Sequence, residues 1–154
     1  MDNEPRFHGD VTEQRHNIMS KIKGKDTKPE IVLRKYLWSK GLHYRKNYKK
    51  LPGKPDIVLT KYKVAVFVDS EFFHGKDWEV QKQKVRKGSN ADYWVKKIER
   101  NIERDKLKDQ ALKDLGWSII HFWSKDVEKN VDQCYLQIVN SIDERGEFDD
   151  QAEE

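Results

Sequence analysis

The sequence predicts a single α/β domain with a mixed central β-sheet flanked by helices. Its 154 residues are enough for one domain with one hydrophobic core. Short β-rich runs precede a long helical segment, and an apolar strand and a last helix follow it, which gives the order α-β-β-β-α-β-α. Charged residues make up 38% of the chain, but five Trp, six Tyr and six Phe supply large side chains for a core.

The first predicted element is a helix that begins after Thr27. The segment from Thr27 to Glu30 is a capping box, and Pro29 suits the first turn of a helix. Gly41 is expected just past the end, because glycine readily adopts the left-handed conformation that terminates helices. The folded domain is therefore expected to begin at residue 27, after a flexible basic arm formed by residues 1–26.

The next segments predict strands and turns. Residues 42–48 are typical of a strand, and residues 50–55 predict a turn because Pro and Gly interrupt regular structure there. Residues 57–60 and 64–69 are β-rich, and the three residues between them predict a hairpin.

A long aromatic and basic loop is expected over residues 71–89, and a helix capped by Asn90 over residues 91–115, ended by Gly116. At a spacing of three or four residues, one face of this helix carries Trp94, Lys97, Asn101, Asp105 and Lys108. Such a face either contacts a nucleic-acid groove or is simply solvated.

The C-terminal part predicts a buried strand at residues 117–123 and a helix at residues 125–142 that Ser124 caps. The folded domain is expected to end there. Residues 143–154 hold seven acids and one Arg, and such a composition predicts a disordered tail.

The charge of the chain is unevenly distributed. The tail carries −6, so residues 1–142 carry +10 although the whole chain has a net charge of +4. Lys and Arg concentrate in residues 34–54, which include Lys54, and in residues 76–87. A basic body favours a polyanion such as nucleic acid through counterion release, although ordinary solvated lysines give the same composition.

Several protein classes are not supported. No apolar run approaches the roughly 18 residues that cross a membrane, and the N-terminus lacks the pattern of a secretory signal. The single cysteine, Cys134, excludes an internal disulfide and a multi-cysteine zinc site. We therefore expect a cytoplasmic, nucleoid-associated protein.

The hairpin brings a carboxylate close to a backbone carbonyl. With a three-residue loop Asp56 lies opposite Val68, and a slip of one residue puts Phe67 there instead. A carboxylate and a carbonyl oxygen suit Mg²⁺, which takes only one or two protein ligands. Such an ion can support phosphodiester hydrolysis. The alternative is that Asp56 only forms an Asx turn at the start of the strand.

Three further residues are candidates for catalysis. His74 follows the second hairpin strand and titrates near neutral pH, so it can deprotonate an attacking water. Glu30 can orient that histidine or a water, unless it serves only the capping box. Asp69 alternates away from Val68 along the strand and need not share the Asp56 face. It can hold a second metal ion, act on the leaving group, or merely cap the loop.

Five motifs in order and at matching spacing resemble the very-short-patch-repair endonucleases, which act at T:G mismatches. The motifs span about residues 12–125 and are Asp26-Thr27-x-x-Glu30, Leu51-Pro-Gly-Lys-Pro-Asp56, Val66-Phe-Val-Asp-Ser-Glu-Phe-Phe-His74, Trp94-x-x-Lys97-Ile-x-x-Asn101-x-Glu-Arg-Asp105 and Leu115-Gly-Trp117. The resemblance implies a restriction-endonuclease-like fold with a cleft for duplex DNA.

The resemblance also implies roles for the site residues. Asp56 falls on the metal-binding aspartate, and Val68 falls on a threonine that gives its backbone carbonyl to the metal. His74 falls on the general-base histidine, and Glu30 on the catalytic glutamate near it. Asp69 stands where the repair enzymes have another histidine, and this departure leaves the handling of the leaving group open.

The implied DNA contacts lie in the loop and the long helix. Phe72 and Phe73 fall on an aromatic pair that wedges into DNA beside the mismatch, and Trp94 on a third aromatic of that wedge. Asn101 falls on a base-contacting position, and Lys97 lies on the same helical face. Unstacking of bases costs least where pairing is already weak, so a wedge favours mismatches. The alternative is that the two Phe side chains anchor the loop to the core.

A second departure concerns zinc. The repair enzymes hold a structural zinc with a His and Cys set, but the corresponding residues here are Lys76, Trp78 and Lys125, none of which is a zinc ligand. We therefore expect no zinc, with packing in its place. We expect a monomeric Mg²⁺-dependent endonuclease, with Mn²⁺ as a substitute, that nicks double-stranded DNA. Mismatch-repair accessory proteins are possible partners by resemblance. The alternatives are a homing or restriction-type nuclease that cuts matched duplex, and a DNA-binding module without catalysis.

Overall fold

The computed structural model describes residues 26–153. Almost all of the predicted basic arm at residues 1–26, with a short helix expected near Arg15–Ile22, lies outside this range. Within it, no helix is both long and apolar enough to cross a lipid bilayer.

The sheet is mixed, as predicted. Its four strands lie in sequence order, β1 (Arg45–Lys46), β2 (Ile57–Leu59), β3 (Val64–Asp69) and β4 (Ser118–Trp123). β2 pairs antiparallel with both β1 and β3, and β4 pairs parallel with β3. The connection from β3 to β4 passes through two helices, as a parallel pair requires.

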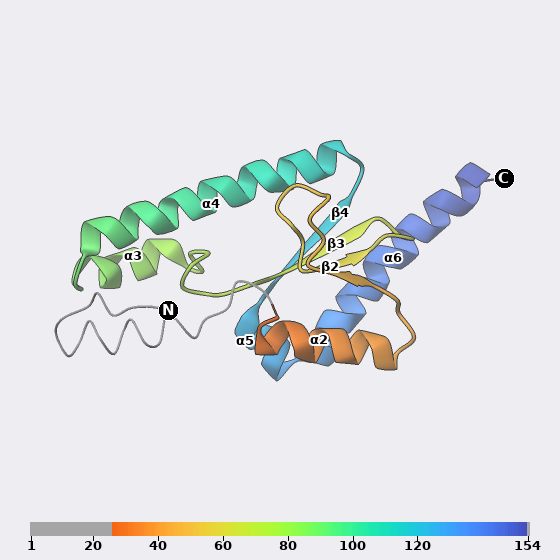
Figure 1. Cartoon of the computed structure of the whole chain (residues 1–154), viewed down its shortest axis with the longest axis horizontal. Coiled ribbons are helices and arrows are strands. Elements are labelled where there is room, and N and C mark those ends of the chain that lie inside the picture. The colour runs from red at the N-terminus through yellow and green to blue at the C-terminus, as the bar shows by residue number, and fades with distance from the viewer. Residues whose placement is uncertain (1–25, 154) are drawn as a thin grey trace.

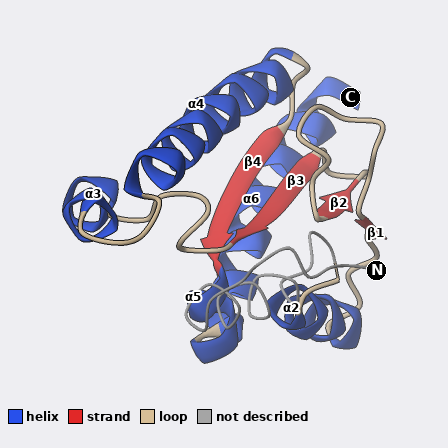
Figure 2. Cartoon of the chain, turned by 60° about the vertical axis from the view of Figure 1, so that its left-hand side comes forward, coloured by secondary structure: helices blue, strands red, loops and turns tan. Residues whose placement is uncertain are grey.

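Helices cover both faces of this sheet (Figures 1 and 2). They are α2 (Lys28–Ser39), α3 (Trp78–Arg86), α4 (Ala91–Asp114), α5 (Ser124–Lys129) and α6 (Val131–Glu153). One core cluster joins the sheet to α2, α5 and α6, and a smaller one joins it to α4. The predicted α/β fold class is therefore confirmed.

The alternation of side chains along β3 separates the two faces. Val64 and Val66 belong to the cluster with α2, α5 and α6, and Ala65 and Phe67 belong to the cluster with α4. Because successive strand residues point to opposite faces, Asp69 follows Phe67 onto the α4 side. The polar end of β3 therefore lies where α4 passes over the sheet.

The start of α2 forms as predicted. The Glu30 carboxylate accepts hydrogen bonds from the Thr27 amide at 3.1 Å and from the Thr27 hydroxyl at 2.8 Å. Gly41, with φ +82°, follows the C-cap Lys40. These local signals fixed both ends of the helix correctly.

The preferred hairpin register was wrong by one residue. Leu59 pairs with Val64, so the loop has four residues rather than three. Lys63 adopts φ +54°, and the Tyr62 amide donates to the Leu59 carbonyl at 3.1 Å. These contacts close a turn one residue longer than predicted, and the observed register is the one that the slip of one residue gives.

Other elements also differ from their predictions. The loop expected over residues 71–89 contains α3, and the predicted strand at residues 42–48 shrinks to β1. The strand predicted as buried is β4, in which Phe122 alone is buried. The single C-terminal helix is divided at Asn130 into α5 and α6, and α6 continues to Glu153 where a disordered tail was expected.

Candidate active site

A pocket of 270 Å³ lies between the polar ends of the central strands and α4. Two loop residues, Gly53 and Lys54, and the α4 residue Lys108 form part of its wall. Its titratable side chains, apart from these lysines, are Asp56, Asp69, His74, Asp105, Asp109 and His121. The structure therefore brings together the predicted Asp56, Asp69 and His74 and adds three residues that the sequence analysis did not assign to the site.

Asp56 precedes β2 and is half-buried. Its Oδ2 accepts a hydrogen bond of 2.7 Å from the Val68 amide, so the two backbones are fixed against each other. Burial raises the pKa of Asp56 to about 7, and the nearby charges of Glu30 and Asp69 add to this rise against the opposing effects of Val68 and His74. Because its charged form is destabilised in this way, the Asp56 carboxylate favours binding of a cation.

Glu30 lies at the start of α2 and is only 2% exposed. Its Oε2 serves the capping box, whereas Oε1 is buried without a hydrogen-bond partner in the described part of the chain. The guanidinium of Arg34 is 3.9 Å from Oε1, an ion-pair distance rather than a hydrogen bond. Glu30 does not line the pocket, but its negative charge acts on Asp56.

His74 lies in the turns that follow β3. Its Nδ1 is 2.7 Å from Oδ2 of Asp105 on α4, so Asp105 rather than Glu30 is its hydrogen-bond partner. Burial lowers the pKa of His74, but the hydrogen bond to Asp105 and the charge of Asp69 outweigh it, so the pKa is raised. A neutral imidazole that donates Nδ1–H to Asp105 keeps a lone pair on Nε2, as a general base requires.

Asp69, at the end of β3, lies in the same pocket as Asp56, although alternation along the strand did not require this. Its Oδ2 is 2.7 Å from His121 Nδ1, and its Oδ1 is 3.9 Å from His74 Nδ1. His121 Nε2 is 2.8 Å from both carboxylate oxygens of Asp109 on α4. Burial opposes protonation of His121, but Asp69 and Asp109 outweigh it and raise the pKa of His121 to about 9.

The residues of the predicted wedge form a cluster beside this pocket. Phe72 packs edge-to-face against Phe73 and Trp94, with ring centroids 5.3 Å apart in both pairs, and Phe72 is 42% exposed. The Asn101 side-chain amide donates to the Phe73 carbonyl at 3.0 Å, so Asn101 holds the loop. Lys97 lies half-buried on the same helix.

This arrangement can hold a cation and a base together. Asp56, Glu30 and Asp69 concentrate negative charge, and a hard divalent ion prefers such oxygen donors. Among the described residues no group of three His, Cys, Asp or Glu side chains forms a complete metal site. Carboxylate oxygens such as those of Asp56 are donors that suit Mg²⁺, which takes most of its ligands from water and phosphate.

The comparisons with known proteins identify the family. The family model for the DNA mismatch endonuclease Vsr matches residues 10–80. The type II nicking enzyme V.HpaIIP of Haemophilus parainfluenzae is 48% identical over 134 residues, which cover 86% of this chain and 94% of that protein. The type II nicking enzyme V.NmeDIP of Neisseria meningitidis serogroup C is 48% identical over 130 residues, covering 84% of this chain and 86% of that protein.

The chain belongs to the very-short-patch-repair endonuclease family. A more distant member, the DNA mismatch endonuclease Vsr of Escherichia coli (strain K12), is 31% identical over 109 residues, which cover 71% of this chain and 68% of that protein. Family membership confirms the resemblance seen in the sequence and the restriction-endonuclease-like fold. The protein is therefore a DNA endonuclease.

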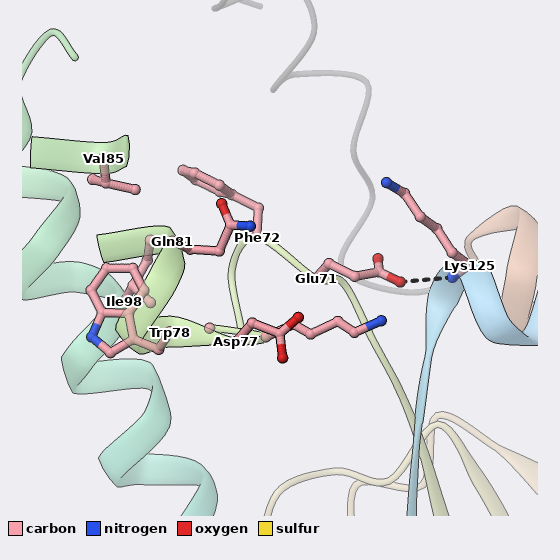
Figure 3. A pocket seen from close by; sticks show the side chains of 10 residues that line it. Glu71, Phe72, Asp77, Trp78, Gln81, Val85, Ile98 and Lys125 are labelled. Carbon is pink, nitrogen blue, oxygen red and sulfur yellow. Dashed lines mark hydrogen bonds between the residues drawn. The ribbon is translucent and has the colours of Figure 1, made fainter. Parts of the chain in front are cut away.

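The three residues that the sequence resemblance places at a zinc site line a second pocket, of 340 Å³ (Figure 3). Lys76, Trp78 and Lys125 all line it. The Lys125 amide donates to Glu71 Oε2 at 2.9 Å, and the Trp78 indole donates to Glu99 Oε2 at 3.1 Å. The first bond joins α5 to the loop after β3, and the second joins α3 to α4. The absence of a structural zinc stays a prediction.

Proposed function

We propose that this endonuclease nicks duplex DNA at T:G mismatches, with Mg²⁺ as its cofactor, in very-short-patch repair. The observation that carries the proposal is one pocket in which Asp56, fixed to the Val68 backbone, faces the same space as the hydrogen-bonded pair of His74 and Asp105. Its relatives support it, since several are named nicking enzymes and the Escherichia coli relative is named a mismatch endonuclease.

Asp56 and the Val68 carbonyl are the residues that would hold the ion, and Mn²⁺ can substitute for Mg²⁺. A divalent ion bound there supplies Lewis acidity to the scissile phosphate. The Asp56 carboxylate has a raised pKa because it is buried, so binding of a cation relieves an unfavourable charge. Glu30, whose buried Oε1 has no hydrogen-bond partner among the described residues and whose charge acts on Asp56, orients a water.

His74 is the general base in this mechanism. Its Nε2 takes a proton from the attacking water, while Asp105 holds Nδ1–H and stabilises the imidazolium that forms. The oxygen of the water attacks phosphorus, and the bond to the 3′ oxygen breaks, which leaves a 5′-phosphate. Lys54 and Lys108, on the wall of the pocket, bind the phosphates that flank the scissile one.

The cluster of Phe72, Phe73 and Trp94 supplies the preference for mismatches. Phe72 is the most exposed of the three and can enter between base steps, while the other two rings and Asn101 support it. Opening a base step costs a few kcal/mol, and less where the pair is a mismatch. The enzyme acts as a monomer on one strand in the cytoplasm, and mismatch-repair accessory proteins are its expected partners.

The test compares nicking of a T:G duplex with nicking of its T:A control in Mg²⁺ under single-turnover conditions. The proposal predicts faster nicking of one strand of the T:G duplex. Equal cleavage of both duplexes would remove the repair function and favour a homing or restriction-type nuclease. Binding without cleavage in either Mg²⁺ or Mn²⁺, across a panel of substrates, would favour a DNA-binding module.

A further inference from the structure

A connected row of acidic and imidazole side chains crosses the pocket from α4 to the sheet and back. It runs from Asp109 through His121, Asp69 and His74 to Asp105. Three of its contacts are hydrogen bonds of 2.7–2.8 Å, and the fourth, between Asp69 Oδ1 and His74 Nδ1, is 3.9 Å long. The row therefore consists of two hydrogen-bonded groups, Asp109–His121–Asp69 and His74–Asp105, with no hydrogen bond between Asp69 and His74.

His121 is fixed at every polar atom of its ring. Nδ1 bonds to Asp69 and Nε2 to both oxygens of Asp109, and the ring stacks on Phe67 with centroids 4.7 Å apart and planes 13° apart. Both partners are carboxylates, so both ring nitrogens act as donors. His121 has no free nitrogen with which to move a proton to or from DNA, and its geometry suits a positioning role.

Asp69 is the side chain that His121 positions. It is 7% exposed, and the Ser124 hydroxyl donates to its backbone carbonyl at 2.9 Å, so the end of β3 is held as well. A rotation of its carboxylate that shortened the 3.9 Å contact would make Asp69 a competitor of Asp105 for His74 Nδ1. The hydrogen bond from His121 opposes that rotation.

We propose that His121, anchored by Asp109, is a positioning residue that keeps the Asp69 carboxylate from displacing Asp105 as the partner of His74. The proposal rests on the role of His74 as general base. It also gives a physical reason for the acidic residue at position 69, because an aspartate there has its own imidazole partner on β4.

The test uses two amide variants that separate the two hydrogen bonds of His121. In H121N the amide nitrogen takes the approximate place of Nδ1 and can donate to Asp69, whereas in H121Q it takes that of Nε2 and reaches only Asp109. We expect the single-turnover rate to fall about tenfold to a hundredfold in H121Q, as for a misplaced catalytic group, and much less in H121N. The dissociation constant for duplex DNA should be unchanged in both.

Three kinetic results would overturn the proposal. The first is a wild-type cleavage rate in H121Q, and the second is an equal loss of cleavage rate in both variants. The third is a loss of activity that comes wholly from weaker binding of DNA. H43N serves as the control for a histidine-to-asparagine change, because His43 packs against Trp38 and lies outside this pocket. It should retain the wild-type rate.

A second readout does not depend on cleavage. The ¹⁵N chemical shifts of the His74 ring report which nitrogen carries the proton and whether it is hydrogen-bonded, and they should change in H121Q but not in H121N. Unchanged His74 shifts in H121Q would contradict the positioning role. If the wild type cleaves no duplex, the proposed function fails, yet these shifts still decide whether His121 controls the partner of His74.

Discussion

His74 Nδ1 lies 2.7 Å from Asp105 Oδ2, and this contact joins the loop after β3 to the middle of α4. It fixes the ring nitrogen that carries the proton in the neutral imidazole and leaves the other one for catalysis. Other residues on the same face of α4 contact the loop or line the pocket. Trp94 and Asn101 support the loop before His74, Asp105 holds the histidine, and Lys108 lines the pocket.

Asp105→Asn should slow cleavage by about 10²- to 10⁴-fold, the usual contribution of general acid–base catalysis. The asparagine keeps the shape but no longer stabilises the imidazolium, so the pKa of His74 should fall. Because the base must be neutral, the rise of rate with pH should then begin at lower pH. A pH–rate profile checks both effects, and an unchanged rate and profile would show that Asp105 does not assist His74. Asp114→Asn, near the exposed end of α4, is the control.

Asp56→Asn should stabilise the metal-free protein at pH 8. The pKa of Asp56 is about 7 in the folded chain against an ordinary value of 3.8, so the cost of its buried charge to folding is absent below pH 3.8 and complete above pH 7. We expect a gain of about 2–4 kcal/mol in the free energy of unfolding at pH 8, almost none at pH 3.5. Thermal unfolding at both pH values checks this.

In Mg²⁺ the wild type, rather than Asp56→Asn, should be the more stable protein at pH 8. A ligand that binds only the folded state raises the melting temperature, so Mg²⁺ should stabilise the wild type and leave Asp56→Asn unchanged. Equal stabilisation of both proteins would place the ion elsewhere. A melting temperature that is lower in Asp56→Asn than in the wild type at pH 8 without metal would show that the carboxylate is not destabilised by its burial.

Phe72→Ala should reduce the preference for mismatched DNA. Loss of one stacking side chain costs about 1–3 kcal/mol of binding energy, and this loss should affect the T:G duplex more than the T:A duplex. The ratio of kcat/KM values for the two duplexes measures it. Trp38→Ala is the control, because Trp38 is 61% exposed on α2 and belongs to another aromatic group. An unaltered ratio in Phe72→Ala would mean that Phe72 only anchors the loop.

Gly75→Ala should disturb the catalytic loop. Gly75 has φ +69°, and a Cβ there would lie 2.5 Å from Ile102 Cδ1 and 2.9 Å from its Cγ1. The left-handed conformation alone costs about 1–2 kcal/mol, and the contact with Ile102 adds to this. Because His74 is the preceding residue, the cleavage rate should fall as well.

Gly116→Ala is the matched control for this substitution. Gly116 has φ +88°, but nothing lies within 4 Å of its added Cβ. It should therefore show the conformational cost alone and keep the cleavage rate. If both variants lose stability equally and cleave equally well, close packing at Gly75 does not position the loop.

The sequence predicted most of what depends on local signals. The capping box from Thr27 to Glu30, the end of α2 near Gly41 and the extent of α4 follow from local signals, and the structure confirms them. Asn90 stands at the N-cap of α4 as predicted, but its side chain makes no cap hydrogen bond. The helix α3 was missed because it is short and polar: Trp78, Val80 and Val85 are its only apolar residues, and none of its residues is buried. It is attached instead by polar contacts, such as the ion pair of Lys82 with Glu99 at 2.7 Å.

The candidate site was predicted only in part. Asp56 and His74 come from one continuous region that a hairpin brings together, so their proximity could be inferred from the sequence, whereas the sequence left open whether Asp69 shares the Asp56 face. His121 and Asp109 meet through the parallel pairing of β4 and the crossing of α4, which no local pattern specifies. The one available signal was a histidine within the otherwise apolar run of residues 117–123, because such a side chain needs a polar partner.

Cleavage of a T:G duplex by Asp56→Asn in Mg²⁺ is the most direct test of the account, since every proposed step depends on a cation held at Asp56. The account predicts that this variant binds the duplex with the affinity of the wild type but nicks it no faster than the wild type does in a chelator. Nicking at the wild-type rate in Mg²⁺ would contradict it.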